Sequence, residues 1–353
     1  MTTPAEKPQI LMLGKIYHTC QEFRTLSQSF KVQVWSSTDA NKTEIESLTL
    51  SPQQITEGTR KQFLNDCSTG IYDHVVAIMR TVDSVQHTGC FDAEMIASLP
   101  SSVKFICHNG AGYDQVDIHE CTERGISVSN TPGVVNDATA DTAMFLLLAA
   151  LRRAWKPQST IRAGAWDGSN PLGRDPKGLI LGILGMGGIG MATAKRAAAF
   201  DLKLQYHNRV PVNNLVKEAL GACGVKPTYV TFEELILTSD IISIHLPLSD
   251  QTRGIIGAQE IGKMKQGVII INTARGPIIN EEDLVRGLES GKIWSAGLDV
   301  FEEEPRVHPE LLCNENVVLL PHIGTATVDT RKRMEVMVID NVKSAILQNS
   351  LIT

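Results

Sequence analysis

The sequence has neither an excess of positive charge nor a long hydrophobic run. Its 353 residues include 33 Lys plus Arg and 39 Asp plus Glu, a formal net charge of -6. This charge provides no field that attracts a phosphate backbone, so we expect no nucleic acid partner. The longest apolar run, residues 143–151, is about half as long as a membrane helix requires and predicts a buried helix. We therefore expect no membrane partner.

The sequence also lacks paired cysteines. Its seven cysteines are odd in number, scattered, and never form a Cys-x-x-Cys pair. This pattern predicts neither a disulfide framework nor a zinc site, so we expect free thiols and no metal. The first apolar run is only four residues long before Gly14 and Lys15, too short for the core of a signal peptide. We expect a cytoplasmic protein.

Short β-branched runs alternate with segments of helical period, in two series along a chain long enough for two domains. Such alternation predicts α/β domains with parallel sheets, and runs that are apolar on both faces predict helices on each side of the sheet. The first series comprises residues 10–14, 32–36, 74–79, 103–110 and 126–130, and the second comprises 179–185, 202–208, 241–247, 267–273, 295–301 and 317–324.

Two further segments predict long helices. One begins at Asn136 or Asp137 as N-cap, runs to Pro157 and could bridge the two sheets. The other covers residues 329–349, and we expect it to return to the first domain. Its apolar side chains fall on one helical stripe: Met334, Met337, Val338, Val342, Ala345 and Ile346.

The stretch "GILGMGGIGM" (182–191) contains a glycine loop of the form G-x-G-x-x-G. Gly185, Gly187 and Gly190 follow a predicted strand (179–184) and precede a predicted helix (188–200), the context that a dinucleotide-binding loop requires. The glycines permit a tight turn, backbone approach to a pyrophosphate and close helix packing, while the helix N-terminus offers free amides. The alternative is a simple turn between strand and helix.

The end of the next predicted strand indicates which dinucleotide binds. NAD enzymes place a carboxylate here for the ribose hydroxyls, whereas this chain has Asn208 and Arg209. A carboxylate would repel a 2'-phosphate, but Asn beside Arg can accept one. The pair favours NADP(H), with NAD(H) use still open. An exposed arginine at a strand end is the alternative.

Three residues that hydride transfer to a carbonyl needs follow three late strands: Arg275, Glu304 and His322. Because ligands bind outside the carboxyl ends of parallel strands, we expect these side chains to converge on one crevice. Each alone has a simpler interpretation. Arg275 could satisfy a helix C-terminus, Glu304 could belong to an acidic surface turn, and His322 could be a core residue.

Taken together, the glycine loop, "NTARG", "LDVFEEEP" and "PHIG" resemble the D-isomer-specific 2-hydroxyacid dehydrogenase family, from about residue 70 nearly to the C-terminus. The residues before about position 70 fit the substrate domain of the family only in their pattern of predicted elements. Within the family, "DHVVAIMR" through "LPSSVKFICHNGAGYDQVDI" is most similar to fungal D-mandelate dehydrogenases, followed by hydroxypyruvate and glyoxylate reductases.

The resemblance implies a Rossmann-like cofactor domain inserted into a flavodoxin-like substrate domain, both doubly wound parallel sheets. The expected boundaries are residues 1–128 for the substrate domain, 129–322 for the cofactor domain and 323–353 for the return segment. It also implies a homodimer formed through the cofactor domains.

The resemblance further implies residue roles. Arg275 would hold the substrate carboxylate and polarise the 2-oxo group. His322 would give a proton to the forming alkoxide, and Glu304 would orient the His322 ring and stabilise its charged form. Asp299 would bind the nicotinamide carboxamide, with a strand-end turn as its alternative.

Backbone amides are implied to bind the substrate carboxylate at Asn109, Gly110, Ala111 and Gly112, although a tight packing loop is an equal alternative for this stretch alone. Further cofactor contacts are implied at Gly188, Ile189, His245, Pro247, Thr273, Ala274, His322 and Gly324. The chain departs from the family at two places. Gly188 replaces the Arg or Asn of many members, and His207 with Asn208 replaces the usual Tyr-Asp.

These features predict an NADP(H)-dependent D-2-hydroxyacid dehydrogenase that reduces 2-oxo acids with bulky, phenylglyoxylate-like R groups. A hydroxypyruvate or glyoxylate reductase is the alternative within the enzyme class. An alternative of another class is a nucleotide-sensing binding protein similar to the corepressor members of this fold, because fold alone does not fix function.

Overall fold

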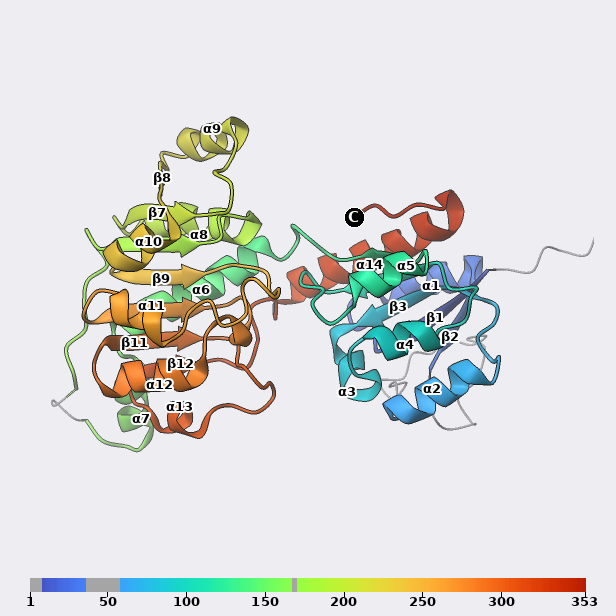
Figure 1. Cartoon of the computed structure of the whole chain (residues 1–353), viewed down its shortest axis with the longest axis horizontal. Helices are drawn as coiled ribbons and strands as arrows, with labels where there is room; N and C mark the ends of the chain where they lie inside the picture. The colour runs from blue at the N-terminus through green and yellow to red at the C-terminus, as the bar shows by residue number, and fades with distance from the viewer. Residues whose placement is uncertain (1–7, 36–57, 167–169) are drawn as a thin grey trace, which may run out of the picture. The chain divides into compact units, whose positions relative to one another are not determined.

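The computed structural model describes residues 8–35, 58–166 and 170–353 (Figure 1). The chain forms two compact units. Unit 1 comprises Met1–Val135 and Thr327–Thr353, and unit 2 comprises Asn136–Ala326. Each unit is built on one parallel sheet with helices packed against it. The predicted α/β class with two parallel-sheet domains is therefore confirmed.

The borders of the units differ from the sequence-based division after residues 128 and 322. The segment after β5 stays with unit 1 because the Thr131 N–H donates to Gly110 O (2.9 Å) and Asn130 Nδ2 donates to Ala111 O (2.7 Å). The segment after His322 stays with unit 2 because the N–H groups of Ile323 and Gly324 donate to Asp299. These are long-range hydrogen bonds, which local sequence patterns do not reveal.

Unit 1 has five parallel strands in the order β2-β1-β3-β4-β5, the order of flavodoxin-like sheets. The strands are β1 (Gln9–Leu13), β2 (Lys31–Val34), β3 (Val75–Thr81), β4 (Phe105–Asn109) and β5 (Ser127–Ser129). Its helices are α1 (Cys20–Ser29), α2 (Arg60–Ser68), the 3-10 turn η2 (Val82–Ser84), α3 (Val85–Thr88), α4 (Ala93–Ser98), α5 (Ile118–Glu123) and α14 (Val328–Gln348).

Both faces of the unit 1 sheet are covered, as the apolar strands predicted. Alternate side chains of β1 enter different cores, because successive residues of a strand point to opposite faces. Leu11 packs with Phe63 on one face, and Ile10 packs with Phe23 and Val338 on the other. α14 contacts β3 and β4 within unit 1.

Unit 2 has seven parallel strands in the order β12-β11-β10-β9-β6-β7-β8, the Rossmann order with one strand added at the edge. The strands are β6 (Ile180–Leu184), β7 (Lys203–His207), β8 (Thr228–Tyr229), β9 (Ile241–Ile244), β10 (Val268–Asn272), β11 (Ile293–Leu298) and β12 (Val317–Leu319). Its helices are α6 (Asn136–Leu151), α7 (Trp155–Arg162), α8 (Gly188–Ala198), α9 (Asn214–Ala222), α10 (Phe232–Thr238), α11 (Ala258–Lys263), the 3-10 turn η3 (Gly276–Ile278), α12 (Glu281–Glu289) and α13 (Pro309–Cys313).

The predicted helix from Asn136 to Pro157 is in fact two helices, and α6 packs on α8 and β11 within unit 2. The break lies at Arg153, whose φ of 46° is left-handed. A contact distant in sequence accompanies this break, since the Arg153 guanidinium lies over the Trp294 ring at 4.2 Å.

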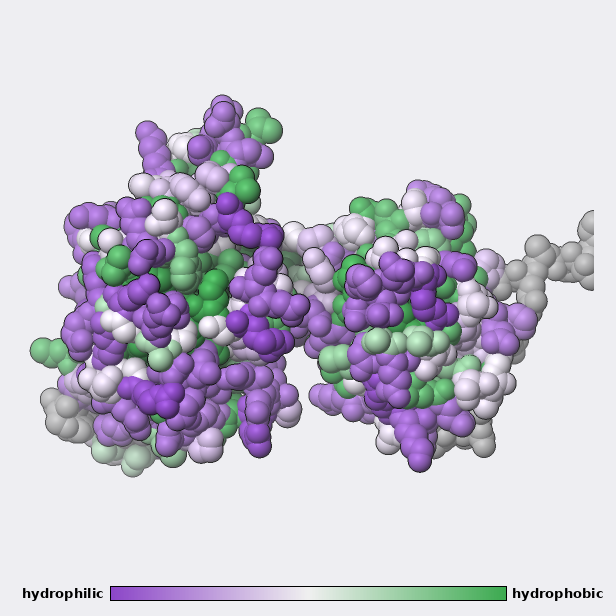
Figure 2. Space-filling view, viewed as in Figure 1, coloured by the Kyte–Doolittle hydropathy of each residue, from purple (hydrophilic) through white to green (hydrophobic). Residues whose placement is uncertain are grey.

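Other strand boundaries also shift. The two-residue strand β8 was not predicted, and the strands expected at 295–301 and 317–324 end at Leu298 and Leu319. After β11 and after β12 the chain leaves the sheet earlier than predicted and forms a loop that carries candidate site residues. Figure 2 shows mostly hydrophilic side chains on the visible surface, with smaller hydrophobic areas such as the one at α9. Within the described ranges, the helices are either too short or too polar to cross a bilayer.

Candidate active site

Arg275, Glu304 and His322 follow three strands that lie side by side in the unit 2 sheet. β10 pairs with β11, and β11 pairs with β12, all in parallel. Their carboxyl ends therefore meet at one edge of the sheet, where ligands bind in open α/β folds. The structure places the three predicted residues in the loops at this edge.

Glu304 and His322 form a direct pair, with 2.8 Å between Glu304 Oε2 and His322 Nδ1. A carboxylate accepts only, so Nδ1 carries the donated proton and Nε2 faces away from Glu304. The other oxygen, Oε1, accepts the Phe301 N–H at 3.0 Å. Burial acts to raise the pKa of Glu304, but the hydrogen bond and charge of His322, with the Phe301 amide and Arg275, lower it below its usual range. Glu304 is thus an ionised partner for His322.

Asp299 fixes the loop that carries His322. It is buried, and its two carboxylate oxygens accept the N–H groups of Ile323 and Gly324, each at 2.8 Å. The His322 N–H also donates to Asp299 O at 2.8 Å, and His322 has a left-handed φ of 55°. Burial raises the pKa of the Asp299 carboxyl, an effect that the two amide bonds oppose. The residue predicted to contact a nicotinamide therefore also holds His322 in place.

Arg275 lies between β10 and η3, half-buried, and its Nη1 donates to Ala274 O at 2.7 Å. Asn272, which was not predicted, braces this turn. Its Nδ2 donates to Arg275 O at 2.9 Å, and its Oδ1 accepts the Ala274 N–H at 3.0 Å. The signal was present in "NTARG", because an Asn at a strand end commonly bonds to the backbone of the following turn.

The glycine loop lies between β6 and α8 as predicted, and each glycine has a distinct surrounding. Gly185 has a φ of 102°, and a Cβ there would lie 2.8 Å from His245 backbone atoms. A Cβ on Gly190 would lie 2.1 Å from Gly185 O, so this glycine permits close packing of helix on strand. A Cβ on Gly187 would meet no atom within 4 Å. Gly187 is thus the position open to a ligand. A Cβ on Gly188 would meet the Asn136 side chain.

Asn208 presents a donor next to this loop. Its Oδ1 accepts the Met186 N–H at 2.7 Å. A backbone N–H can bond only to the amide oxygen, so the orientation of this amide is fixed and its Nδ2 hydrogens point elsewhere. Arg209, the next residue, is exposed.

Two other predicted cofactor residues have buried polar atoms with no hydrogen-bond partner in the described part of the chain: Thr273 Oγ1 and His245 Nδ1. His245 Nε2 lies 2.9 Å from Ser243 Oγ, and burial lowers the pKa of its imidazole to about 4, so the ring is neutral at pH 7. Unpaired buried polar atoms are costly unless a ligand or water satisfies them. The unpaired atoms of Thr273 and His245, together with the open space at Gly187, therefore fit a bound dinucleotide. The remaining cofactor candidates lie in the same loops: Ile189 on α8, Pro247 after β9, Ala274 after β10 and Gly324 after His322.

The predicted carboxylate loop of unit 1 begins where β4 ends. Its three carbonyl groups are bonded within unit 1: Gly110 O to Thr131, Ala111 O to Asn130, and Gly112 O to His108 Nε2 at 3.1 Å. The N–H groups of Ala111 and Gly112 donate to no other residue in the described ranges. Asn109 ends β4 and is buried. The loop therefore offers two backbone donors.

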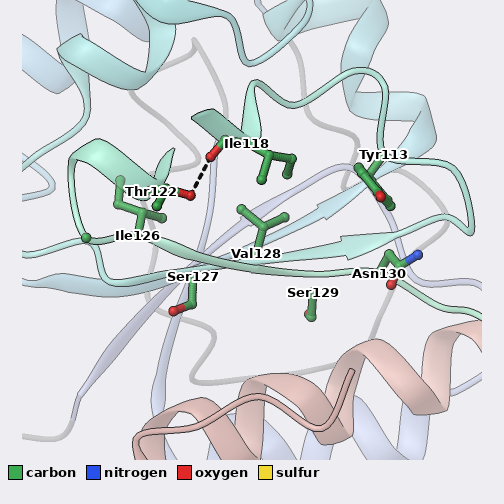
Figure 3. Close-up of a pocket in the computed structure, with 9 residues that line it drawn as sticks. Tyr113, Ile118, Thr122, Ile126, Ser127, Val128, Ser129 and Asn130 are labelled. Atoms are coloured by element: carbon green, nitrogen blue, oxygen red, sulfur yellow. Dashed lines mark hydrogen bonds between the residues drawn. The ribbon is translucent and has the colours of Figure 1, made fainter. Parts of the chain in front are cut away.

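A separate pocket of about 550 Å³ lies in unit 1 along the edge strand β5 (Figure 3). Val128 points toward Ile118 and Ile126, while Ser127 and Ser129 point to the other face of the strand. Charged side chains are missing from its lining, and so are all the predicted site residues. The described residues of the whole chain also hold no cluster of His, Cys, Asp and Glu that could bind a metal.

The chain is similar to known enzymes over nearly its whole length. Residues 144–324 match the family described as "D-isomer specific 2-hydroxyacid dehydrogenase, NAD binding domain". The chain is 49% identical to 4-methyl-2-oxopentanoate reductase A of Aspergillus oryzae over 98% of this chain and 97% of that protein.

Solved structures of such enzymes superpose over nearly the whole chain. A glyoxylate reductase from Paecilomyes thermophila is 47% identical, with a TM-score of 0.89 and coverage of 99% of this chain and 98% of that one. The D-mandelate dehydrogenase of Rhodotorula graminis is 30% identical, with a TM-score of 0.85 and coverage of 99% and 97%. A match of this extent requires shared ancestry along both units. The chain therefore belongs to the D-isomer-specific 2-hydroxyacid dehydrogenase family and is an NAD(P)-dependent oxidoreductase.

Proposed function

We propose that the protein is an NADP(H)-preferring reductase that converts 2-oxo acids to D-2-hydroxy acids. The observation that carries the proposal is the 2.8 Å pair between Glu304 and His322, next to Arg275 at one edge of the unit 2 sheet. A nucleotide-sensing binding protein would not need this set, and the similar proteins named above are enzymes.

His322 supplies the proton. Because Nδ1 is engaged by Glu304, Nε2 is the atom that donates to the carbonyl oxygen of the substrate as it becomes a hydroxyl. Arg275 binds the substrate carboxylate through its planar guanidinium and polarises the 2-oxo group. The bound reduced nicotinamide supplies the hydride. The proposed role of the Ala111 and Gly112 N–H groups in unit 1 is to bind a carboxylate.

The preference for NADP(H) rests on Asn208 and Arg209. The orientation of the Asn208 amide leaves Nδ2 as its donor, which suits a phosphate and not a ribose hydroxyl that must donate. Arg209 adds a permanent positive charge. Gly185, Gly187 and Gly190 would hold the pyrophosphate of the cofactor, and Thr273, His245 and Asp299 would hold the rest of it.

The proposed substrates have bulky R groups, with 4-methyl-2-oxopentanoate placed before phenylglyoxylate. The Aspergillus oryzae relative named for the first acid is 49% identical, whereas the D-mandelate dehydrogenase is 30% identical. A glyoxylate or hydroxypyruvate reductase is the second candidate, because the glyoxylate reductase from Paecilomyes thermophila is 47% identical.

The test is the loss of reduced-nicotinamide absorbance with four acids, 4-methyl-2-oxopentanoate, phenylglyoxylate, glyoxylate and hydroxypyruvate, each with NADPH and with NADH. Faster turnover of a bulky acid with NADPH is the expected result. Preference for glyoxylate would select the second candidate, and preference for NADH would refute the cofactor assignment. His322→Asn is the negative control, expected to bind NADPH but to lose turnover by roughly three orders of magnitude.

We also propose that unit 2 forms a homodimer. Large apolar side chains are exposed on α6, on α7 and beyond: Phe145, Trp155, Ile161, Trp166 and Leu172. Large exposed apolar areas mark interaction sites in soluble proteins. Light scattering after gel filtration should give twice the chain mass, and a monomer at micromolar concentration would contradict the assignment.

The cytoplasm is the proposed location, because all seven cysteines are free thiols. Disulfides are rare in reducing compartments. Fractionation of cells that express the tagged protein tests this.

A further inference from the structure

The segment that carries Arg275 and the segment that carries Glu304 are joined by a pair of glutamates, Glu281 and Glu302. Glu281 is the first residue of α12, six positions after Arg275, and Glu302 lies two positions before Glu304. Glu281 is buried, and Glu302 is exposed. Two ionised carboxylates are both acceptors, so their side chains do not bond to each other.

Instead, each carboxylate accepts the backbone N–H of the other residue. Glu302 Oε2 accepts the Glu281 N–H at 3.1 Å, and Glu281 Oε1 accepts the Glu302 N–H at 2.6 Å. The Glu281 N–H is among the first amides of a helix, which have no partner within the helix and favour an anion. Two charge-assisted bonds in opposite directions fix both distance and register between the segments.

The backbones also meet closely near this pair. A Cβ on Gly276, directly after Arg275, would lie 1.8 Å from the Phe301 carbonyl carbon. The next residue after Phe301 is Glu302, and the Phe301 N–H itself donates to Glu304 at 3.0 Å. A change of spacing here is therefore transmitted to both Arg275 and Glu304.

We propose that Glu281 and Glu302 are positioning residues, which hold the Arg275 and Glu304 segments at one spacing and so set the distance between the carboxylate-binding guanidinium and the proton donor. The proposal rests on the proposed function of Arg275, Glu304 and His322. It explains why a carboxylate is kept in a buried position close to Glu302 and Glu304, where burial and the like charges raise the pKa of Glu281.

The test compares Glu281→Ala, Glu281→Gln and Glu282→Ala. Alanine removes the acceptor for the Glu302 N–H, and we expect kcat to fall about 10- to 100-fold and KM for the 2-oxo acid to rise, with KM for NADPH unchanged. Glutamine keeps an acceptor oxygen and should restore most of kcat. Glu282 is the matched control, because it is the neighbouring carboxylate, it is exposed, and its ion pairs are with Arg286 and His308 and not with the Glu302 backbone.

An unchanged kcat in Glu281→Ala, or a loss equal to that in Glu282→Ala, would overturn the proposal, even if the variant melts at a lower temperature. If Glu281→Ala does not fold, Glu302→Ala breaks the other half of the pair from an exposed position. This variant should also show a lower kcat with an unchanged KM for NADPH. An unchanged kcat in that variant would likewise overturn the proposal.

Hydrogen exchange separates this proposal from the proposed function. The Glu302 amide should exchange more slowly in the wild type than in Glu281→Ala, and equal rates would overturn the pair. Absence of turnover by the wild type with every 2-oxo acid would instead overturn the proposed function, with the exchange result still deciding whether the pair joins the two segments.

Discussion

His322 Nδ1 and Glu304 Oε2 lie 2.8 Å apart although eighteen positions separate the residues in the chain. β11 and β12 pair in parallel, so the loops that follow them leave the same edge of the sheet. Asp299 then binds the backbone of the His322 loop from the end of β11. The pair is thus held by the sheet and by a buried carboxylate, not by local sequence.

Glu304→Gln tests this pair through pH. Burial acts to raise the pKa of Glu304, but the opposing effect of His322 and the Phe301 amide is larger in sum. The pKa of Glu304 therefore lies below its usual value of 4.5. The contribution of the pair to stability is therefore present above pH 4.5 and is lost as pH falls through the lowered pKa. In the variant this loss of stability in acid should shrink. The variant should also reduce 2-oxo acids more slowly, because a neutral amide holds the His322 ring less firmly than a carboxylate does. Urea unfolding measured from about pH 2 to 7, which spans the usual range of a carboxyl group, and reduction rates measured near pH 7 check this. Identical rates in the variant and the wild type would contradict a role for Glu304 in positioning the proton donor.

Gly187→Ala separates binding from folding. Gly187 has a φ of -80° and open space around a Cβ, so alanine should leave the fold intact. If a pyrophosphate approaches there, the added methyl should weaken NADPH binding at least about tenfold, or 1.4 kcal/mol. Titration of NADPH fluorescence measures this. Gly190→Ala is the contrasting variant, because its Cβ would lie 2.1 Å from Gly185 O and should destabilise unit 2. Unaltered NADPH affinity in Gly187→Ala would place the cofactor elsewhere.

Asn208→Asp should shift cofactor preference toward NADH. The carboxylate would keep an acceptor for the Met186 N–H but would repel a 2'-phosphate and accept from ribose hydroxyls. We expect the ratio of kcat/KM for NADPH to that for NADH to fall by about 100-fold, equivalent to roughly 2.7 kcal/mol. Arg209→Gln should lower the same ratio by removing the charge. A ratio that moves in neither variant would show that these residues do not select the cofactor.

Glu335→Ala should destabilise unit 1 by at least about 3 kcal/mol. Glu335 is buried on α14 and accepts the N–H groups of Tyr17, His18 and Thr19 at 2.8–2.9 Å, with the Thr19 hydroxyl at 3.0 Å. Its loss removes the acceptor of all four donors, and the N–H and hydroxyl of Thr19 are then buried without one. Hydrogen exchange of β1 and α1 peptides in urea measures the change. The exposed Glu289→Gln is the control, expected to stay within about 0.5 kcal/mol of the wild type. Equal exchange in the two variants would contradict this role for Glu335.

Local patterns predicted the fold class and the positions of the candidate residues because they depend on short-range physics. Apolar strands covered on both faces, the strand-glycine-helix context of Gly185 to Gly190, and polar residues at strand ends are each readable within about 20 residues. Boundaries were less accurate. The helix break at Arg153 accompanies a contact with Trp294, and the early end of β12 accompanies the bonds of Asp299 with the Ile323 and Gly324 N–H groups.

The sequence by itself determined the two α/β units, the glycine loop and the family to which the chain belongs, since these follow from periodicity and short motifs. Only the tertiary structure decided that Asp299 braces the His322 loop, that Asn208 presents a donor, and that Glu281 and Glu302 join the Arg275 and Glu304 segments. Each of these rests on hydrogen bonds between residues about 20 or more positions apart, and such bonds form only when the order of strands in the sheet brings distant loops together.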